Sequence, residues 1–165
     1  MNVNPPHILF LCTGNYFRSR FAEIFFNHRA AAMGLGHRAD SRGLAVDLVD
    51  WNVGPISVYT LQGLELRGIP PGDPLRYPIQ VLESDLSAAR HVIAVKEAEH
   101  RPLLDRRFPG WCERVEFWHV DDIDCAQPED ALSVLEREVE QLLRRLAREA
   151  EGVRSRSSIT VTNHR

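Results

Sequence analysis

The sequence predicts a single α/β domain, a three-layer αβα sandwich around a four-stranded parallel sheet. Short apolar runs alternate along the chain with longer amphipathic stretches, which is the pattern of strands and helices in α/β folds. The length of 165 residues fits one domain and is sufficient to bury a core without disulfides.

The first half of the chain contains two predicted strands, each followed by a predicted helix. Residues 7–11 form a continuous apolar run, as expected of a buried parallel strand. Residues 19–33 carry apolar side chains compatible with one buried helix face, and Gly34 is expected to end this helix. Residues 39–45 are expected to form the second strand, although their alternation is weak. A helix is expected over residues 55–68, because proline at its first position favours a helix start.

The second half begins with a loop, because residues 69–78 contain four prolines. Residues 82–89 are expected to form one or two helical turns, and residues 91–95 (His-Val-Ile-Ala-Val) are the clearest internal strand. Residues 97–108 are expected to be helical, with an early interruption by their proline. Residues 115–120 are expected to form the fourth strand.

A long last helix is predicted after Pro128, over residues 129–150. Its apolar side chains recur at spacings of three and four residues, which fits docking of one helix face onto the sheet or, as the alternative, the seam of a coiled coil. This stripe consists of Leu132, Leu135, Val139, Leu142 and Leu146. The chain is basic and polar beyond Gly152, so we expect a folded domain over residues 1–152 and a flexible tail over residues 153–165.

Composition and charge limit the possible partners and compartment. The hydrophobic fraction of 44% and the charged fraction of 26% are normal for a soluble globular protein. A net charge of -3 gives no reason to expect nucleic acid or an anionic membrane as partner. The longest apolar run near the start, residues 8–12, is too short to span a bilayer or to form the core of a secretion signal. The three cysteines, Cys12, Cys112 and Cys125, are too widely spaced to suggest a disulfide framework. We expect a cytoplasmic protein, and the sequence predicts no oligomeric state.

The segment from Cys12 to Ser19 has the features of an oxyanion-binding catalytic loop. Cys12 stands at the expected end of the first strand and Arg18 at the expected start of the first helix, with five residues between them. A connection of this length can turn successive backbone N–H groups inward, and the helix N-terminus adds positive partial charge. Gly14 allows a tight path, and Asn15 tolerates a left-handed conformation. The positive field favours the nucleophilic thiolate of Cys12, while Arg18 offers a planar fork of donors to two phosphate oxygens.

Ser19 is placed to donate a hydrogen bond to the Cys12 thiolate. The alternative for Cys12 is a buried core cysteine, a common location for a free thiol. The apolar strand before it, the Gly-Asn pair within the loop, the serine after the arginine and the helix that follows favour the catalytic interpretation.

At these residues the chain resembles the low-molecular-weight protein tyrosine phosphatase family, whose loop reads C-x-G-N-x-C-R-S at the end of the first strand. Residues 12–19 match all but one fixed position, and the weaker resemblance along the chain extends over residues 7–146. The family often has a second cysteine where this chain has Phe17, so a protective disulfide with Cys12 is absent, but phosphoryl transfer does not need it. The resemblance implies a phosphatase-like domain over residues 1–152.

The resemblance also implies roles for the loop residues. Cys12 would be the nucleophile and Arg18 the phosphate clamp, with loop amides stabilising the transition-state charge in place of a metal or cofactor. The remaining loop residues implied to contact substrate or to order the loop are Thr13, Gly14, Asn15, Tyr16, Phe17 and Ser19.

A phosphocysteine mechanism further needs a proton donor for the leaving oxygen and a base for the attacking water. The family supplies both from an aspartate in a late loop, usually followed by proline. The corresponding loop here, residues 119–124, reads His-Val-Asp-Asp-Ile-Asp; Asp122 aligns best, although Ile123 replaces the proline. Asp121 and Asp124 remain alternatives. The histidine and three aspartates of this loop are also compatible with a metal site, or with solvated carboxylates that cap a helix.

Trp51 falls in the loop after the second strand, where the family places an aromatic residue that walls the substrate cleft and stacks on the phosphotyrosine ring. The alternative for Trp51 is an ordinary turn leading into a helix. Tyr16 is expected to have its side chain free to face the mouth of the cleft. Cys112 and Cys125 flank the acid loop and are interpreted as structural or incidental thiols, with resolving thiols as the alternative.

The sequence therefore predicts a phosphatase that hydrolyses phosphotyrosine proteins or small aryl phosphates through a phosphocysteine on Cys12 and releases inorganic phosphate. Arsenate reduction on the same fold is an alternative that requires a relay of thiols, for which Cys112 and Cys125 are the candidates. A second alternative is a non-catalytic module that binds a phosphoprotein without turning it over.

Overall fold

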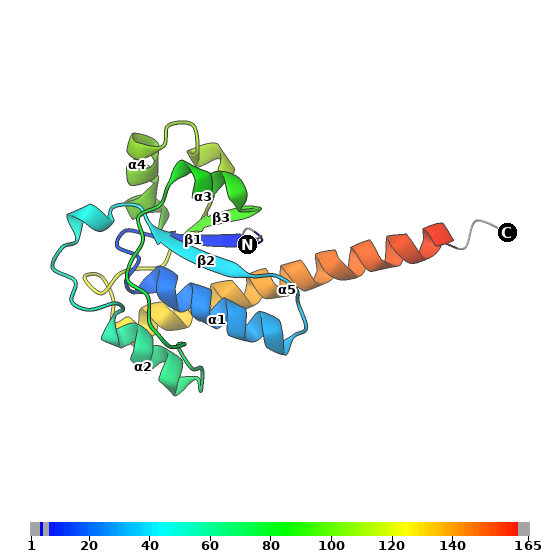
Figure 1. Ribbon diagram of the computed structural model, residues 1–165, viewed down its shortest axis with the longest axis horizontal. Helices are drawn as coiled ribbons and strands as arrows, with labels where there is room; N and C mark the ends of the chain where they lie inside the picture. The colour runs from blue at the N-terminus through cyan, green and yellow to red at the C-terminus, as the bar shows by residue number, and fades with distance from the viewer. Residues whose placement is uncertain (1–3, 5–6, 162–165) are drawn as a thin grey trace.

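Parallel strands form one sheet at the centre of the protein (Figure 1). The computed structural model describes residue 4 and residues 7–161. The strands are β1 (Ile8–Cys12), β2 (Ala39–Gly43), β3 (His91–Ala94) and β4 (Glu116–Phe117), in the spatial order β2-β1-β3-β4. All pairings between neighbouring strands are parallel, so the four-stranded parallel sheet confirms the predicted fold class.

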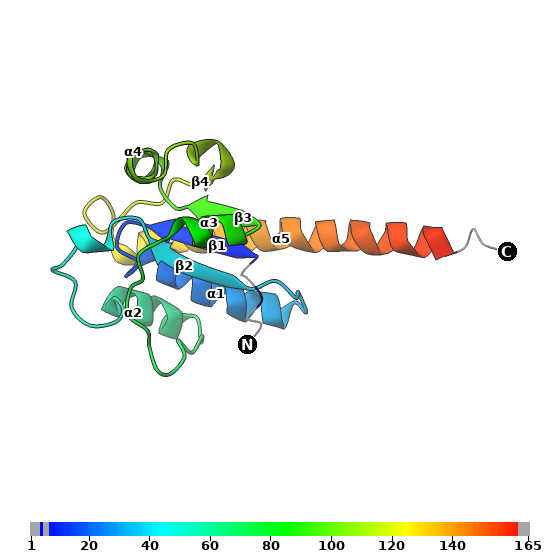
Figure 2. The same cartoon turned by 45° about the horizontal axis from the view of Figure 1, so that its top comes forward.

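Helices cover both faces of this sheet (Figure 2). The α-helices are α1 (Arg18–Ala32), α2 (Val58–Leu66), α3 (Glu83–Ala88), α4 (Glu97–Arg107) and α5 (Pro128–Val161), and short 3₁₀ helices are η1 (Val46–Leu48) and η2 (Cys112–Arg114). One hydrophobic cluster joins the sheet to α1, α2 and α5, and a second joins it to α3 and α4. None of the helices within the described part of the chain is long and apolar enough to cross a membrane.

The central strand β1 contributes to both cores, because successive side chains of a strand point to opposite faces. Ile8, Phe10 and Cys12 face the cluster with α1 and α5, whereas Leu9 and Leu11 face the cluster with α3 and α4. All five residues are buried, as the continuous apolar run predicted. This alternation places the Cys12 side chain at the carboxyl end of the sheet, on the side that α1 covers.

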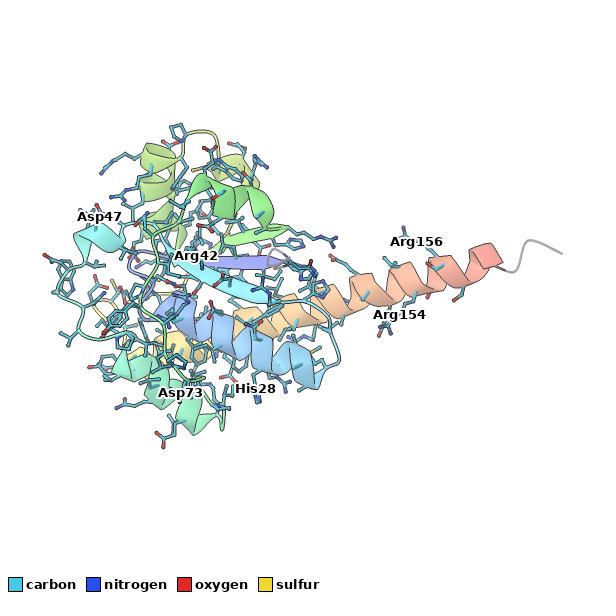
Figure 3. The ribbon with its side chains drawn as sticks, viewed as in Figure 1. His28, Arg42, Asp47, Asp73, Arg154 and Arg156 are labelled. Atoms are coloured by element: carbon cyan, nitrogen blue, oxygen red, sulfur yellow. The ribbon has the colours of Figure 1, made fainter. Side chains whose placement is uncertain are left out.

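The apolar stripe of the last helix packs against the sheet and α1, as predicted. Its five residues, Leu132, Leu135, Val139, Leu142 and Leu146, are all buried in the cluster with α1. The helix is longer than predicted, because α5 continues through Gly152 to Val161, whereas a flexible tail was expected from residue 153. Along the extension the Ser155 hydroxyl donates to the Glu151 carbonyl one turn earlier, at 3.1 Å. Figure 3 shows Arg154 and Arg156 on this extension, beyond the rest of the domain. Residues 162–165 of the expected tail lie outside the described residues.

The helix predicted from residue 55 begins later, at Val58. Gly54 has a φ of 76°, so the chain turns there instead of entering a helix. Ser57 is the N-cap, and its hydroxyl accepts a hydrogen bond from the Tyr59 N–H at 3.2 Å. Ser57 is thus the helix-start residue that a proline-based prediction overlooked.

Two further elements in the second half differ from the prediction. Pro102 does not interrupt α4, which runs continuously through it, and Leu104 of the same helix is fully buried in the core. Packing of α4 in the core therefore stabilises the helix by more than the missing N–H of Pro102 destabilises it. The fourth strand is shorter than predicted, since regular pairing covers only Glu116–Phe117. Beyond it the chain still follows β3, because the Trp118 N–H bonds the Ala94 carbonyl at 2.9 Å.

Candidate active site

A cavity of about 620 Å³ opens at the carboxyl end of the parallel sheet. Loops that follow parallel strands meet at this edge, which is where open α/β sheets bind ligands. The lining comes from residues 12–18 apart from the buried Asn15, residues 48, 49, 51 and 52, residues 57–59, Glu99 at the start of α4, and residues 122–124 after β4. Predicted site residues that line it are Cys12, Thr13, Gly14, Tyr16, Phe17, Arg18, Trp51 and Asp122.

Asn15 lies behind the cavity and fixes the path of the loop. Its φ of 49° is in the left-handed region, as expected for an asparagine in such a loop, and its side chain is fully buried. The amide nitrogen donates to the hydroxyls of Ser19 and Ser41 at 2.8 and 2.9 Å. The amide oxygen accepts from the Arg76 guanidinium and from the Ile79 N–H, at 2.9 and 3.1 Å. Four partners from three different segments therefore hold this strained residue in place.

Gly14 allows a second segment to pack closely on the loop. A Cβ atom at this position would lie 2.9 Å from Cγ2 of Val49 and 3.2 Å from Nδ2 of Asn52. The loop after β2 therefore rests directly on the backbone of the loop after β1, and a side chain at residue 14 would push the two apart.

Cys12 and Ser19 are in direct contact. Their Sγ and Oγ atoms lie 2.9 Å apart, and both side chains are buried. Because the Ser19 oxygen already accepts a hydrogen from Asn15, its own hydrogen is available to the sulfur of Cys12. The hydrogen bonds Asn15–Ser19–Cys12 therefore direct a hydroxyl donor at the Cys12 sulfur.

Arg18 enters the cavity from the first turn of α1, and its side chain is only 2% exposed. Its Nη1 atom donates to Oε2 of Glu99 at 2.9 Å and to the carbonyl of Val120 at 3.0 Å. Its Nη2 atom donates to Oε1 of Glu99 at 2.9 Å and to Oδ2 of Asp122 at 3.2 Å. The guanidinium is thus fixed by three residues from two segments, α4 and the loop after β4, and Asp122, the candidate acid, lies beside it.

Glu99 is a site residue that the sequence analysis missed. It also accepts a hydrogen bond from the Thr13 hydroxyl at 2.7 Å. Burial raises the pKa of Glu99, but the hydrogen bonds and charge of Arg18 outweigh this effect and lower the pKa from 4.5 to about 2. No motif marks this residue in the sequence. Its position just after the third predicted strand was the available signal, because carboxyl ends of parallel strands meet at one edge.

The three aspartates of the acid loop have different surroundings. Asp122 lines the cavity, whereas Asp121 pairs with the ammonium of Lys96 at 3.0 Å. Asp124 also lines the cavity. Ile123, which stands where the family usually has proline, donates its N–H to Oδ1 of Asp122 at 2.8 Å. A proline has no such donor, so this departure gives the Asp122 carboxylate a local hydrogen bond that the usual residue would not supply.

Two aromatic residues lie at the mouth of the cavity. Trp51 lines it and is 71% exposed, so its ring is available to a ligand. Tyr16 also lines it, but its hydroxyl donates to the Val53 carbonyl at 2.5 Å. Tyr16 therefore connects the loop after β1 to the loop after β2. Its side chain faces the cavity, but it is not free, because its hydroxyl is bonded to Val53.

The remaining thiols lie away from the cavity. Cys112 belongs to the cluster on the α4 side, and its sulfur lies 3.8 Å from the carbonyl of Arg101. Cys125 is exposed, with its sulfur 3.8 Å from the ammonium of Lys96. Within the described residues, no group of three or more histidine, cysteine or acidic side chains is arranged to hold a metal ion, the acid loop included.

A second acidic residue, Glu23, lies behind the loop next to Asp40 and Arg76. Oε1 of Glu23 accepts from the Ser41 hydroxyl and from Nη2 of Arg76, both at 3.1 Å. Burial, followed by a hydrogen bond with Asp40, raises the pKa of Glu23 from 4.5 to about 7, against the charge of Arg76. Glu23 therefore keeps its proton at mildly acidic pH while Arg76 holds Asn15.

This raised pKa predicts a pH-dependent stability. Because the folded state binds the proton more tightly than the unfolded state, the contribution of Glu23 is fully present below pH 4.5 and is lost as the pH rises toward about 7. Relative to a Glu23→Gln variant, the wild type should lose about 1–3 kcal/mol of unfolding free energy across this window. Urea denaturation of both proteins at pH 5 and pH 8 tests this, and parallel pH profiles would contradict it.

The fold and the cavity together define the class of protein, an α/β phosphatase with a cysteine and an arginine in the loop after its first strand. Residues 7–152 match the model of the family described as Low molecular weight phosphotyrosine protein phosphatase, and the chain belongs to this family. No curated protein sequence matches the chain at a significant level. Family membership makes the protein a phosphatase, a hydrolase whose substrates are phosphoproteins or phosphate esters.

Solved structures agree with this assignment. YfkJ from Bacillus subtilis is 26% identical, with 90% of this chain and 99% of that chain covered and a TM-score of 0.74. The low molecular weight protein tyrosine phosphatase from T. tengcongensis is 25% identical, with 86% and 97% covered and a TM-score of 0.67. The YwlE arginine phosphatase from Geobacillus stearothermophilus is 22% identical, with 98% and 99% covered and a TM-score of 0.63, and this likeness concerns the fold alone.

Proposed function

We propose that this phosphatase hydrolyses phosphotyrosine, or another aryl phosphate monoester, through a phosphocysteine intermediate on Cys12. The observation that carries the proposal is the convergence of Cys12, Arg18 and Asp122 on one cavity, with Ser19 bonded to the sulfur. These residues supply a nucleophile, an oxyanion clamp and a proton donor, so the reaction needs no metal or cofactor.

The first step is transfer of the phosphoryl group to the enzyme. The Cys12 thiolate attacks phosphorus, and the bond between phosphorus and the aryl oxygen breaks. Arg18 and the backbone N–H groups of the loop hold the phosphoryl oxygens, whose charge they stabilise in the transition state. Asp122, protonated at this stage, gives its proton to the leaving oxygen.

The second step is hydrolysis of the phosphocysteine. The Asp122 carboxylate accepts a proton from a water molecule, which attacks phosphorus and releases inorganic phosphate. The Cys12 sulfur leaves as a thiolate, and the hydrogen bond from the Ser19 hydroxyl stabilises it. The chain Asn15–Ser19–Cys12 thus contributes to both steps, because the sulfur carries negative charge before the first step and after the second.

The mouth of the cavity favours an aromatic phosphoester held by a protein. Large apolar side chains surround it with much of their surface exposed, namely Leu48, Trp51, Val58, Tyr59 and Ile123. Trp51 presents its ring, which suits stacking on the phenyl group of phosphotyrosine. A small aliphatic phosphate would leave these apolar side chains in water. We therefore propose that they contact the aryl group and the substrate residues that flank it.

The alternatives have less support. Arsenate reduction through a thiol relay needs a second cysteine near Cys12, and neither Cys112 nor Cys125 lines the cavity. A non-catalytic phosphate-binding module would not require an aspartate beside the clamp, yet Asp122 lies 3.2 Å from Arg18. Because the fold is shared with an arginine phosphatase, phosphoarginine is included in the test.

The proposal is tested by turnover of para-nitrophenyl phosphate, a phosphotyrosine peptide and phosphoarginine. Wild type should turn over the two aryl phosphates, and Cys12→Ser should lose at least about 10³-fold in kcat, because the hydroxyl is a poor nucleophile without a base. Cys112→Ser is the matched control and should keep full activity. Full activity of Cys12→Ser, or a preference for phosphoarginine over the aryl substrates, would refute the proposal.

A further inference from the structure

One carboxylate joins the two ends of the catalytic loop. Glu99 accepts a hydrogen bond from Thr13, the second residue of the loop, and from Arg18, the clamp at its other end. Glu99 belongs to α4, which follows a different strand, and it lies 86 and 81 positions from its two partners along the chain. The contacts are short, at 2.7 to 2.9 Å, and the Glu99 side chain is 28% exposed where it faces the cavity.

The pairing between Glu99 and Arg18 uses the end of the guanidinium. One carboxylate oxygen contacts Nη1 and the other contacts Nη2, both at 2.9 Å, in the geometry of a bidentate pair. The Val120 carbonyl takes a further hydrogen of Nη1 at 3.0 Å. A planar group held in this way cannot rotate about its Nε–Cζ bond, so an incoming oxyanion meets the side edge formed by Nε and Nη2, where it replaces Oδ2 of Asp122 at Nη2.

We propose that Glu99 is a positioning residue for the reaction: by joining Thr13 to Arg18 it holds the guanidinium with its side edge toward the phosphoryl group. This inference rests on the proposed function, because it assigns Glu99 a share in the catalytic rate. Glu99 does not act on the substrate itself. Its effect passes through Arg18, whose two donors must meet oxygens that move as the phosphoryl group passes through its transition state.

The start of α4 is built to hold Glu99 in place. The Lys96 N–H donates to Nδ1 of His100 at 3.0 Å, and the His100 ring is fully buried. Because Nδ1 accepts, the hydrogen of the neutral ring is on Nε2, which lies 3.7 Å from Oε1 of Glu99. Burial, then the charge of Arg18, lowers the pKa of His100 to about 3, so the ring stays neutral and does not compete with Arg18 for the Glu99 carboxylate.

Charge and positioning predict opposite effects for loss of the carboxylate. Glu99 offsets part of the positive charge of Arg18, so its removal should strengthen the attraction of the site for a bound phosphate. If Glu99 also positions Arg18, its removal should slow the chemical step even though phosphate still binds. A Glu99→Gln variant therefore separates the two roles by the difference between phosphate affinity and kcat.

The experiment measures kcat and KM with para-nitrophenyl phosphate, the inhibition constant of inorganic phosphate, and the melting temperature. Glu99→Gln should lower kcat by about 10- to 100-fold, with a phosphate inhibition constant equal to that of wild type or tighter. Thr13→Val, which removes only one of the contacts, should lower kcat by about 3- to 10-fold. The matched control is Glu97→Gln in the same helix; Glu97 is 39% exposed and pairs with Arg101, so its kcat should be unchanged.

Two results would overturn the inference. The first is a kcat for Glu99→Gln within about twofold of wild type. The second is a fall in kcat together with weaker phosphate binding and a lower melting temperature, which would show a merely structural role. If Glu99→Gln does not fold, Thr13→Val decides the question through the same comparison of kcat with the phosphate inhibition constant. Wild-type protein without turnover on any substrate would refute the proposed function itself, whereas an active wild type with an unaffected Glu99→Gln refutes only the positioning role.

Discussion

Replacement of Arg18 by lysine should lower kcat/KM for para-nitrophenyl phosphate by about 10³-fold, although it keeps the positive charge. The guanidinium contacts acceptors of Glu99, Val120 and Asp122 at the same time, and a phosphoryl group reaches its side edge by replacing Asp122 at Nη2. A single ammonium cannot reproduce this planar set of donors, so it leaves the half-buried Glu99 carboxylate incompletely paired and binds the phosphoryl oxygens at one point.

Steady-state kinetics of Arg18→Lys and of Arg29→Lys check this expectation. Arg29 lies in the same helix, is 41% exposed and pairs with Glu140, so the same change there should leave the kinetics within about twofold of wild type. If charge alone were sufficient, Arg18→Lys would retain most of its kcat/KM, and the clamp would have to be described as an electrostatic attraction without specific geometry.

Asp122→Asn should lower kcat by about 10²- to 10³-fold for phenyl phosphate, with a smaller effect for para-nitrophenyl phosphate. Phenolate is the more basic leaving group and depends more on a proton from the enzyme, whereas para-nitrophenolate leaves easily without one. Phosphate should bind as tightly as to wild type or more tightly, because Arg18 keeps its contacts with Glu99 and Val120 and loses the competing carboxylate of Asp122.

Asp121→Asn is the matched control, since it makes the same chemical change one residue away. Asp121 is 51% exposed and pairs with Lys96, so the variant should retain wild-type kcat. Measurement of both variants on both substrates identifies the proton donor. A loss of kcat in Asp121→Asn or Asp124→Asn, with the kcat of Asp122→Asn unaffected, would assign the acid to a different residue of the loop.

The parts of the site that local sequence encodes were predictable. The loop from Cys12 to Ser19 is contiguous, and strand end, glycine, left-handed asparagine and helix start each have a local signal. Glu99 and Arg76 could not be found in this way, because they reach the loop from segments more than sixty positions away. Their contacts depend on how the helices pack on the sheet, which a single sequence does not state.

The same distinction between local signals and contacts formed on packing explains the errors in the predicted fold. Pro55 suggested a helix start, but the left-handed turn at Gly54 and the capping hydroxyl of Ser57 moved the start of α2 to Val58. The last helix was expected to end at residue 150 and a flexible tail to begin at residue 153, because a single glycine and a polar composition predict a loose tail. Cooperative extension from a well-packed helix carries α5 beyond this point.

The guanidinium of Arg18 has a further consequence for product release. Its Nη2 atom contacts a carboxyl oxygen of Asp122, so a phosphate that enters must take this donor from Asp122. Binding is then an exchange of partners whose free energy is the difference between two contacts and not the full strength of one. Inorganic phosphate therefore meets an internal competitor at Arg18. The residue that we assign as proton donor in the first step also competes with the product phosphate for Arg18 after the second.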